Sequence, residues 1–295
     1  MSAAADGQAQ TMAPANGAPG AALARHPLGP RFWIPLAWTT MVVVLALTAS
    51  LLPLRSPIEA DFTVISNWPD ATHWFGTDQL GRDIFSRAVF GARISLVVGL
   101  LAPAFGLGVG IFLGLAAGYF RGRTESIIVA AMDAIMAFPG ILVVLAVTAY
   151  VGANTAILIL LLGFLTIPAF MRLARANTLV FAQREFVLAA RAMGATHARV
   201  LTLEILPNVM IPMLIYALLA VSRVIVTEGV LSFLGLSVPP PQPTWGNMIA
   251  DGQTDLATLP YIPFIPSALM FLTLLSINLI GERLRAQTDF RGSAL

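Results

Sequence analysis

The sequence contains no cysteine and no lysine, and it has only three histidines among 295 residues. All 17 basic residues are therefore arginines. Without lysine or cysteine the chain has no P-loop lysine, no Schiff-base amine and no thiol nucleophile, and the scattered histidines argue against a structural zinc site. We therefore expect this chain to bind no metal or cofactor itself, and any ATP and Mg that drive it must be bound by another subunit.

Charged residues are also scarce. They make up 11% of the chain, compared with about 25% in soluble domains, whereas 57% of the residues are hydrophobic. The net charge is only +2, and the arginines are spread along the chain, which argues against nucleic-acid binding. This composition is typical of an integral membrane protein.

Long apolar stretches predict how the chain crosses the membrane. A helix rises about 1.5 Å per residue, so about 20 apolar residues cross the hydrocarbon core. Six stretches approach this length, which predicts an all-α integral membrane protein with six transmembrane helices. The expected spans are residues 33–53, 94–120, 127–150, 155–171, 209–228 and 262–281.

The arginines predict the orientation of these spans. With the N-terminus in the cytoplasm, most arginines fall in cytoplasmic segments, and Arg55, Arg82, Arg87 and Arg93 lie outside. Cytoplasmic segments of membrane proteins carry the excess of basic residues. We therefore expect a multi-pass protein of the plasma or inner membrane with both termini in the cytoplasm.

The N-terminal segment differs in composition from the rest. Residues 1–30 are rich in Ala, Gly and Pro and show no apolar periodicity, which predicts a disordered tail before a transmembrane domain at 31–295. A cleaved secretory signal at 25–50 is the alternative interpretation. Its apolar run is long for such a signal, which favours a membrane span.

The second span carries a glycine at every fourth position. Gly106, Gly110, Gly114 and Gly118 form a smooth groove along one helical face, where another backbone can approach closely. We expect this face to pack against a helix of the same chain, although a subunit interface is also compatible with it. Prolines at 103, 139 and 168 are expected to kink their spans.

Three ionisable residues lie within the expected spans. A charge in the membrane is costly, so each is a candidate functional residue. Asp133 lies early in the third span and is the candidate for the transport path. Arg223 and Glu228 lie late in the fifth span, where we expect them to reach water or lipid headgroups at the interface.

Two segments are expected on the external side. Residues 73–96 show a capping signal at Thr77 or Asp78 followed by helical periodicity, which predicts a surface helix against the bundle. Residues 231–252 contain three consecutive prolines, which predict a rigid, extended segment. Its "WGNM" sequence, Trp245 to Met248, is a candidate docking surface or membrane-interface anchor.

The segment at 184–208 is polar and basic but has helical spacing. Phe186, Ala189, Ala190 and Met193 repeat on one helical face, and Gly194 follows where a helix ends in left-handed geometry. A second short helix over 197–206 is expected to end at Pro207. The small residues would let a partner surface approach closely, and Arg191 could supply charge-assisted bonds.

This segment resembles the cytoplasmic loop of the permease subunits of binding-protein-dependent ATP-binding-cassette importers. The motif of that loop is E-A-A, three residues, G, nine residues, I-x-L-P. Leu188, Ala189 and Ala190 stand at its start and Gly194 at its glycine, and Glu204 to Pro207 stand at its end. Leu188 and Glu204 replace the glutamate and the isoleucine, and Glu185 and Ile205 lie nearby.

Five ordered segments extend the resemblance over residues 30–290. They are "FGTDQLGRDIFSRAVFGARISLVVGL", "MDAIMAFPGIL", "EFVLAARAMGA", "ILPN" and "LSFLGLSVPPPQPTWGNM". Together they are similar to the C-type membrane subunit of the dipeptide, oligopeptide and nickel permease family.

The resemblance implies a non-catalytic subunit with the type I importer permease fold. It implies a second, homologous permease, two cytoplasmic ATPases and an external peptide-binding protein as partners. It assigns ATPase coupling to Glu185, Ala189, Ala190, Arg191, Gly194 and Pro207, and docking of the binding protein to the region of Trp245, Gly246, Asn247 and Met248. Peptides are the expected cargo, with nickel chelates, glutathione and heme as alternatives.

Two other classes remain as alternatives. An ion-driven secondary transporter would need a titratable group deep in the membrane, for which Asp133 is the available residue. A membrane scaffold would leave the 184–208 segment as an inert loop. An enzyme acting alone has least support, since the sequence shows no catalytic triad or paired carboxylates.

Overall fold

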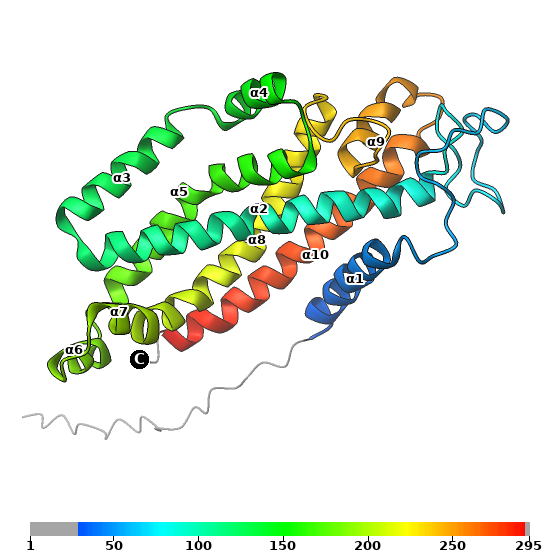
Figure 1. The fold of residues 1–295 in the computed structure, drawn as a ribbon. Coiled ribbons are helices and arrows are strands. Elements are labelled where there is room, and N and C mark those ends of the chain that lie inside the picture. The colour runs from blue at the N-terminus through cyan, green and yellow to red at the C-terminus, as the bar shows by residue number, and fades with distance from the viewer. Residues whose placement is uncertain (1–28, 293–295) are drawn as a thin grey trace, which may run out of the picture.

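The computed structural model describes residues 29–292, with side chains as far as Gln287. The described residues form a bundle of helices along one long axis (Figure 1). The predicted N-terminal tail lies almost wholly outside them. The longer helices are α1 (Pro30–Thr48), α2 (Ile84–Phe120), α3 (Gly122–Met136), α4 (Gly140–Val151), α5 (Thr155–Phe181), α8 (Leu206–Phe233) and α10 (Tyr261–Gly292). The shorter ones are α6 (Glu185–Ala192), α7 (His197–Arg199), a π-helical turn (Val200–Ile205), α9 (Trp245–Gly252) and a 3-10 turn (Gln253–Asp255).

Within the described residues, five helices are long and apolar enough to cross a membrane. They are α1, α2, α5, α10 and the helix from His197 to Phe233. A sixth span is formed by α3 and α4 together, which meet at an angle of 72°. Pro139 precedes α4 and has no N–H group, so the helical hydrogen-bond ladder is interrupted there. The predicted all-α fold with six spans is confirmed, with the third span broken rather than straight.

The glycine face of α2 packs against α5. At Gly114, a Cβ atom would lie 2.5 Å from Cβ of Ala174, and a Cβ at Gly118 would meet Thr178. Gly106 and Gly110 make the same kind of contact with Thr166 and Phe170. The glycines therefore let the two helices approach closely within this one chain, which replaces the hydrophobic driving force that is missing in lipid.

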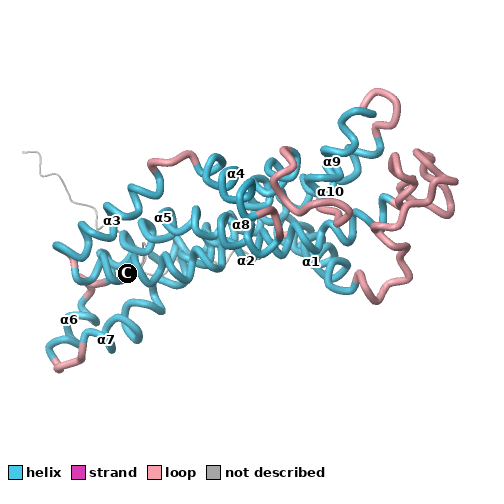
Figure 2. The backbone as a smooth tube through the Cα atoms, turned by 45° about the horizontal axis from the view of Figure 1, so that its top comes forward, coloured by secondary structure: helices cyan, strands magenta, loops and turns pink. Residues whose placement is uncertain are grey.

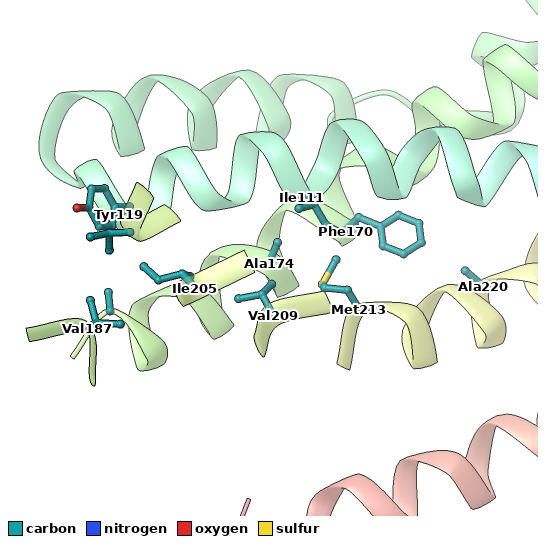
Figure 3. Packing of buried hydrophobic residues seen from close by; sticks show 11 residues of the cluster. Ile111, Tyr119, Phe170, Ala174, Val187, Ile205, Val209, Met213 and Ala220 are labelled. Atoms are coloured by element: carbon teal, nitrogen blue, oxygen red, sulfur yellow. The ribbon is translucent and has the colours of Figure 1, made fainter. Parts of the chain in front are cut away.

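The two ends of the bundle differ. α6 and α7 project at one end, whereas α9 and the irregular segment between α1 and α2 lie at the other (Figure 1). Loops and turns gather at the α9 end (Figure 2). A single hydrophobic cluster joins α2, α5 and α8 to α6 at the opposite end, and it includes Val187, Ile205 and Val209, which have no exposed surface (Figure 3).

The surface helix predicted for residues 73–96 is wrong. Residues 73–83 form turns, and the helix that begins at Ile84 is continuous with the second span. Asp83, not Thr77 or Asp78, caps it by accepting a hydrogen bond from the Ser86 amide. The reason is the turn at Gly81, whose φ of +74° lets the chain fold back against Asp61 before the helix begins.

Candidate functional site

The segment at 184–208 begins with α6 and turns at Gly194. The Ala195 amide donates to the carbonyl of Ala190 at 3.0 Å, and the Gly194 amide donates to that of Arg191 at 2.9 Å. This pair of bonds closes the helix in a Schellman motif, which requires left-handed geometry at Gly194. Its φ is +85°, and no other atom lies within 4 Å of a Cβ placed there. Gly194 is therefore needed for its backbone conformation rather than for space within the chain.

The predicted break at Pro207 does not occur. α7, the π-helical turn and α8 follow one another without interruption, so that one helix runs from His197 to Phe233. The Leu206 amide donates to the carbonyl of Leu201, five residues back, as in a π-helix. Pro207 follows this turn in the first turn of α8, where its missing N–H is accommodated. The polar segment and the fifth span are thus one rigid element.

One side of α6 packs inward. Val187 and Ala190 are buried against Val200 and Ile205. Ala190 is therefore a packing residue of the loop itself, which corrects the prediction that a partner approaches it directly. Arg191 is exposed at the surface, but its guanidinium lies over the ring of Tyr119, 4.7 Å from the centroid.

The other side of α6 is exposed and partly apolar. Glu185 and Ala189 lie on it with Leu188 and Phe186, and Met193 at the turn is 83% exposed. Sequence analysis assigned Phe186 and Met193 only to the apolar stripe of the helix. Exposed apolar side chains gathered on a projecting loop are typical of a docking surface.

Asp133 makes an ion pair that the sequence analysis did not predict. Its Oδ1 lies 2.5 Å from a terminal nitrogen of Arg172, which joins α3 to α5. About half of each side chain is exposed. A second pair, between Glu125 and Arg175, joins the same two helices.

A cavity of about 390 Å³ lies between α4, α5 and α8. Most of its lining is apolar and includes Ile141, Val144, Leu162, Phe170, Val224 and Leu231. Arg223 is the one charged residue that the structure places in this lining, and its guanidinium lies 5.0 Å from the ring centroid of Tyr216. This cavity is the natural candidate for part of a transport path.

The expected docking residues at 245–248 lie mostly in the interior. Trp245 is 1% exposed, and its indole N–H donates to the carbonyl of Ala88. Gly246 packs against the backbone of Gly229, and Met248 is also buried. The segment is helical rather than extended from Trp245 on, because Thr244 caps α9 in a capping box with Asn247. Only Asn247 of the four remains partly exposed, so the predicted docking role does not fit the other three.

Glu228 is also buried, contrary to the prediction that it reaches water or headgroups. Its carboxylate accepts hydrogen bonds from the hydroxyls of Ser95, Ser232 and Ser237, at 2.8 to 3.2 Å. Ser232 in turn bonds to Thr244. The hydroxyls replace the water that the carboxylate loses, and they connect α8 to α2 and to the start of α9.

A second polar cluster joins the segment before α2 to α9. The Arg82 guanidinium donates to Asp78 at 2.7 Å, and Arg82 and Arg87 both lie within 4 Å of Asp251. Burial raises the pKa of the Asp251 carboxyl above its ordinary value, although Arg87 and Arg82 act in the opposite direction. The cluster fixes α9 against the end of α2.

The geometry defines a class: a multi-pass helical membrane protein with a projecting helix-turn-helix loop at one end. Residues 110–291 match the family model described as "Binding-protein-dependent transport system inner membrane component". The chain belongs to this family.

Relatives place it more closely. The chain is 39% identical over 239 residues to the "Glutathione transport system permease protein GsiD" of Pectobacterium atrosepticum, covering 81% of this chain and 79% of that protein. It is also 39% identical over 249 residues to the protein of the same name from Escherichia coli O6:K15:H31, covering 84% and 82%. These matches place it in the peptide and nickel group of importer permeases.

Solved structures support the fold. The chain resembles the permease fold in an inward-facing structure of the MetNI methionine ABC transporter, with a TM-score of 0.54 and 18% identity, over 68% of this chain and 95% of that chain. It also resembles an amino acid ABC transporter structure, with a TM-score of 0.53 and 16% identity, over 69% and 94%. The fold is therefore that of a type I importer permease.

Family membership settles the class of activity. The chain is a non-catalytic permease subunit of an ATP-driven importer in the inner membrane, and ATP hydrolysis belongs to partner ATPases. A permease of this type works with a second permease, an ATPase and a substrate-binding protein. The alternatives of an ion-driven carrier and a scaffold are therefore excluded.

Proposed function

We propose that this subunit forms, with a homologous second permease, the membrane path for short peptides that an external binding protein delivers. The observation that carries the substrate class is the 39% identity to permeases named for glutathione transport, over more than four fifths of the chain. Glutathione is itself peptide-like, which favours di- or oligopeptides over nickel chelates or heme.

The loop at 184–208 is proposed to couple the path to an ATPase that binds ATP and Mg. Its exposed face, with Glu185, Ala189 and Met193, is available for contact. Because the same helix continues to Phe233 without a break, displacement of the loop would move α8 as a rigid element. Ala190 and Pro207 act inside the loop, and Gly194 sets its turn.

The orientation follows from the same proposal. An ATPase acts in the cytoplasm, so the α6 and α7 end is cytoplasmic and the α9 end is external. The binding protein would then meet Asn247 and the loops around it. Asp133, half exposed beside Arg172, is proposed to border the path on its cytoplasmic half.

Two measurements test this proposal. The chain, tagged and extracted gently from its native membrane, should co-purify with a second permease and an ATPase. The reconstituted transporter, supplied with its binding protein and ATP, should import labelled di- or tripeptides, and omission of this subunit should abolish uptake. Uptake of a nickel chelate or heme, with no uptake of any peptide, would refute the substrate class.

A further inference from the structure

Arg223 lies near the middle of the membrane rather than at its surface. Its neighbour Ile225 packs at Gly99 of α2. Gly99 is six residues, or about 9 Å along the helix, from Arg93, and Arg93 bonds to Ser50 just beyond the end of α1. Since α8 runs antiparallel to α2 (Figure 1), Arg223 lies still deeper than Ile225. The expectation that Arg223 reaches the interface is therefore not met.

Arg223 has no anionic partner within the described residues. Its contact is with the ring of Tyr216, which covers one face of the guanidinium and leaves its N–H edges free. The hydroxyls of the two threonines in the cavity lining, Thr166 and Thr227, donate to backbone carbonyls of their own helices. The guanidinium is thus the strong free donor of this cavity.

An arginine at this depth cannot face lipid without a large cost. It must face water, an acidic side chain of another subunit, or an anionic ligand. The cavity it lines, at about 390 Å³, is within the usual range for small ligands. Its apolar walls would strengthen any charge interaction by keeping the local dielectric low.

We propose that Arg223 is the specificity-determining contact of the membrane path and that it binds the C-terminal carboxylate of a passing peptide. This inference rests on the proposed function. A guanidinium presents parallel N–H groups that match a carboxylate in a bidentate pair. Every peptide with a free C-terminus carries this group whatever its side chains, so the contact selects the class of cargo without selecting its sequence.

The first test compares two cargoes in the complete, reconstituted transporter. Uptake of a tripeptide and of its C-terminal amide is measured with the wild-type subunit, Arg223→Gln and Arg223→Lys, always with the same binding protein. Arg223→Gln should lower uptake of the free acid at least about tenfold, the effect of one lost charge-assisted bond, and leave the amide within about twofold. Arg223→Lys should restore part of the loss.

A second test does not depend on the identity of the cargo. The chain has no cysteine, so Arg223→Cys introduces a single thiol, and Leu100→Cys is the matched control. Leu100 is 61% exposed, adjoins Gly99 at a similar depth and is absent from the cavity lining. A membrane-impermeant thiol reagent should label Cys at 223 at least about tenfold faster than Cys at 100, because only the first faces water.

The outcomes separate the two proposals. Equal loss of both cargoes in Arg223→Gln, as expected if Arg223 pairs with an acid of the second permease, would overturn the carboxylate contact. Labelling at 223 no faster than at 100 would also overturn it. If the wild type imports no peptide, the proposed substrate class fails, and the carboxylate contact fails with it even where labelling shows that position 223 faces water.

Discussion

The hydroxyl of Tyr119 lies 2.8 Å from Nδ1 of His197, and this contact joins the last turn of α2 to the first turn of the helix that continues to Phe233. The Tyr119 ring also lies against the imidazole and beneath the guanidinium of Arg191. One aromatic side chain therefore connects both arms of the projecting loop to the second span. The loop is braced on the bundle rather than suspended from it.

This brace predicts different effects for two substitutions of Tyr119. Tyr119→Ala removes the whole ring and should cost about 3 kcal/mol locally, as for other buried aromatic residues. It should lower peptide uptake per ATP hydrolysed several-fold. Tyr119→Phe removes one hydrogen bond, worth about 1 kcal/mol, and should stay within about twofold of wild type. Equal coupling ratios in the alanine variant and the wild type would contradict the role of the brace.

The glycine face of α2 predicts a position-specific loss of stability. Gly114→Leu forces side-chain atoms into Ala174 and the backbone of α5, and overpacking of this kind costs about 1–3 kcal/mol or more. Gly108→Leu is the control, because nothing lies within 4 Å of a Cβ there. Thermal unfolding in detergent should show a clear decrease for position 114 and no decrease for 108. Equal melting temperatures would argue against close α2–α5 packing.

The buried carboxylate of Glu228 predicts a third effect. Glu228→Ala leaves the hydroxyls of Ser95, Ser232 and Ser237 without their acceptor, at a cost of about 3 kcal/mol or more. Glu228→Gln keeps the shape and one acceptor oxygen and should cost about 1 kcal/mol. Chemical unfolding of the purified subunit measures both. The reverse order of stabilities would show that the hydroxyls do not depend on this side chain.

The ion cluster at the α9 end predicts unequal effects of its members. The Arg87 side chain is 3% exposed and that of Asp251 is 44% exposed. Removing one partner of a buried pair costs about 3–5 kcal/mol, whereas solvent screens an exposed one. Arg87→Ala should therefore destabilise the subunit more than Asp251→Ala. Limited proteolysis of the segment between α1 and α2 would detect the loosened contact, and equal protection in both variants would contradict it.

The sequence predicted the fold well because membrane spans are encoded locally. Apolar length identified every span, and the spacing of four between Gly106 and Gly118 indicated the packing face. The proline at 139 indicated a kink, but its angle depends on how α3 and α4 pack on α5. The continuous helix through Pro207 was missed because a π-helical turn has no strong sequence signal.

The sites were predicted less completely, since their geometry depends on contacts between distant segments. Gly194 was found from the end of an amphipathic helix. The pairing of Tyr119 with His197 and of Asp133 with Arg172 spans 78 and 39 residues, which local spacing cannot reveal. Trp245 and Glu228 were assigned to surfaces because a single polar or aromatic residue in a span does not show which side of its helix is covered.

The most direct test of the coupling role uses Gly194. Val strongly resists the left-handed conformation that Gly194 adopts at φ +85°, whereas Asn tolerates it. The tagged wild type, Gly194→Val and Gly194→Asn are extracted from membranes that contain equal amounts of subunit, and the co-purified ATPase is quantified. The account predicts that the Val variant retains the second permease but loses most of the ATPase, and that the Asn variant retains both. Full retention of the ATPase by the Val variant would contradict the role of this loop in coupling.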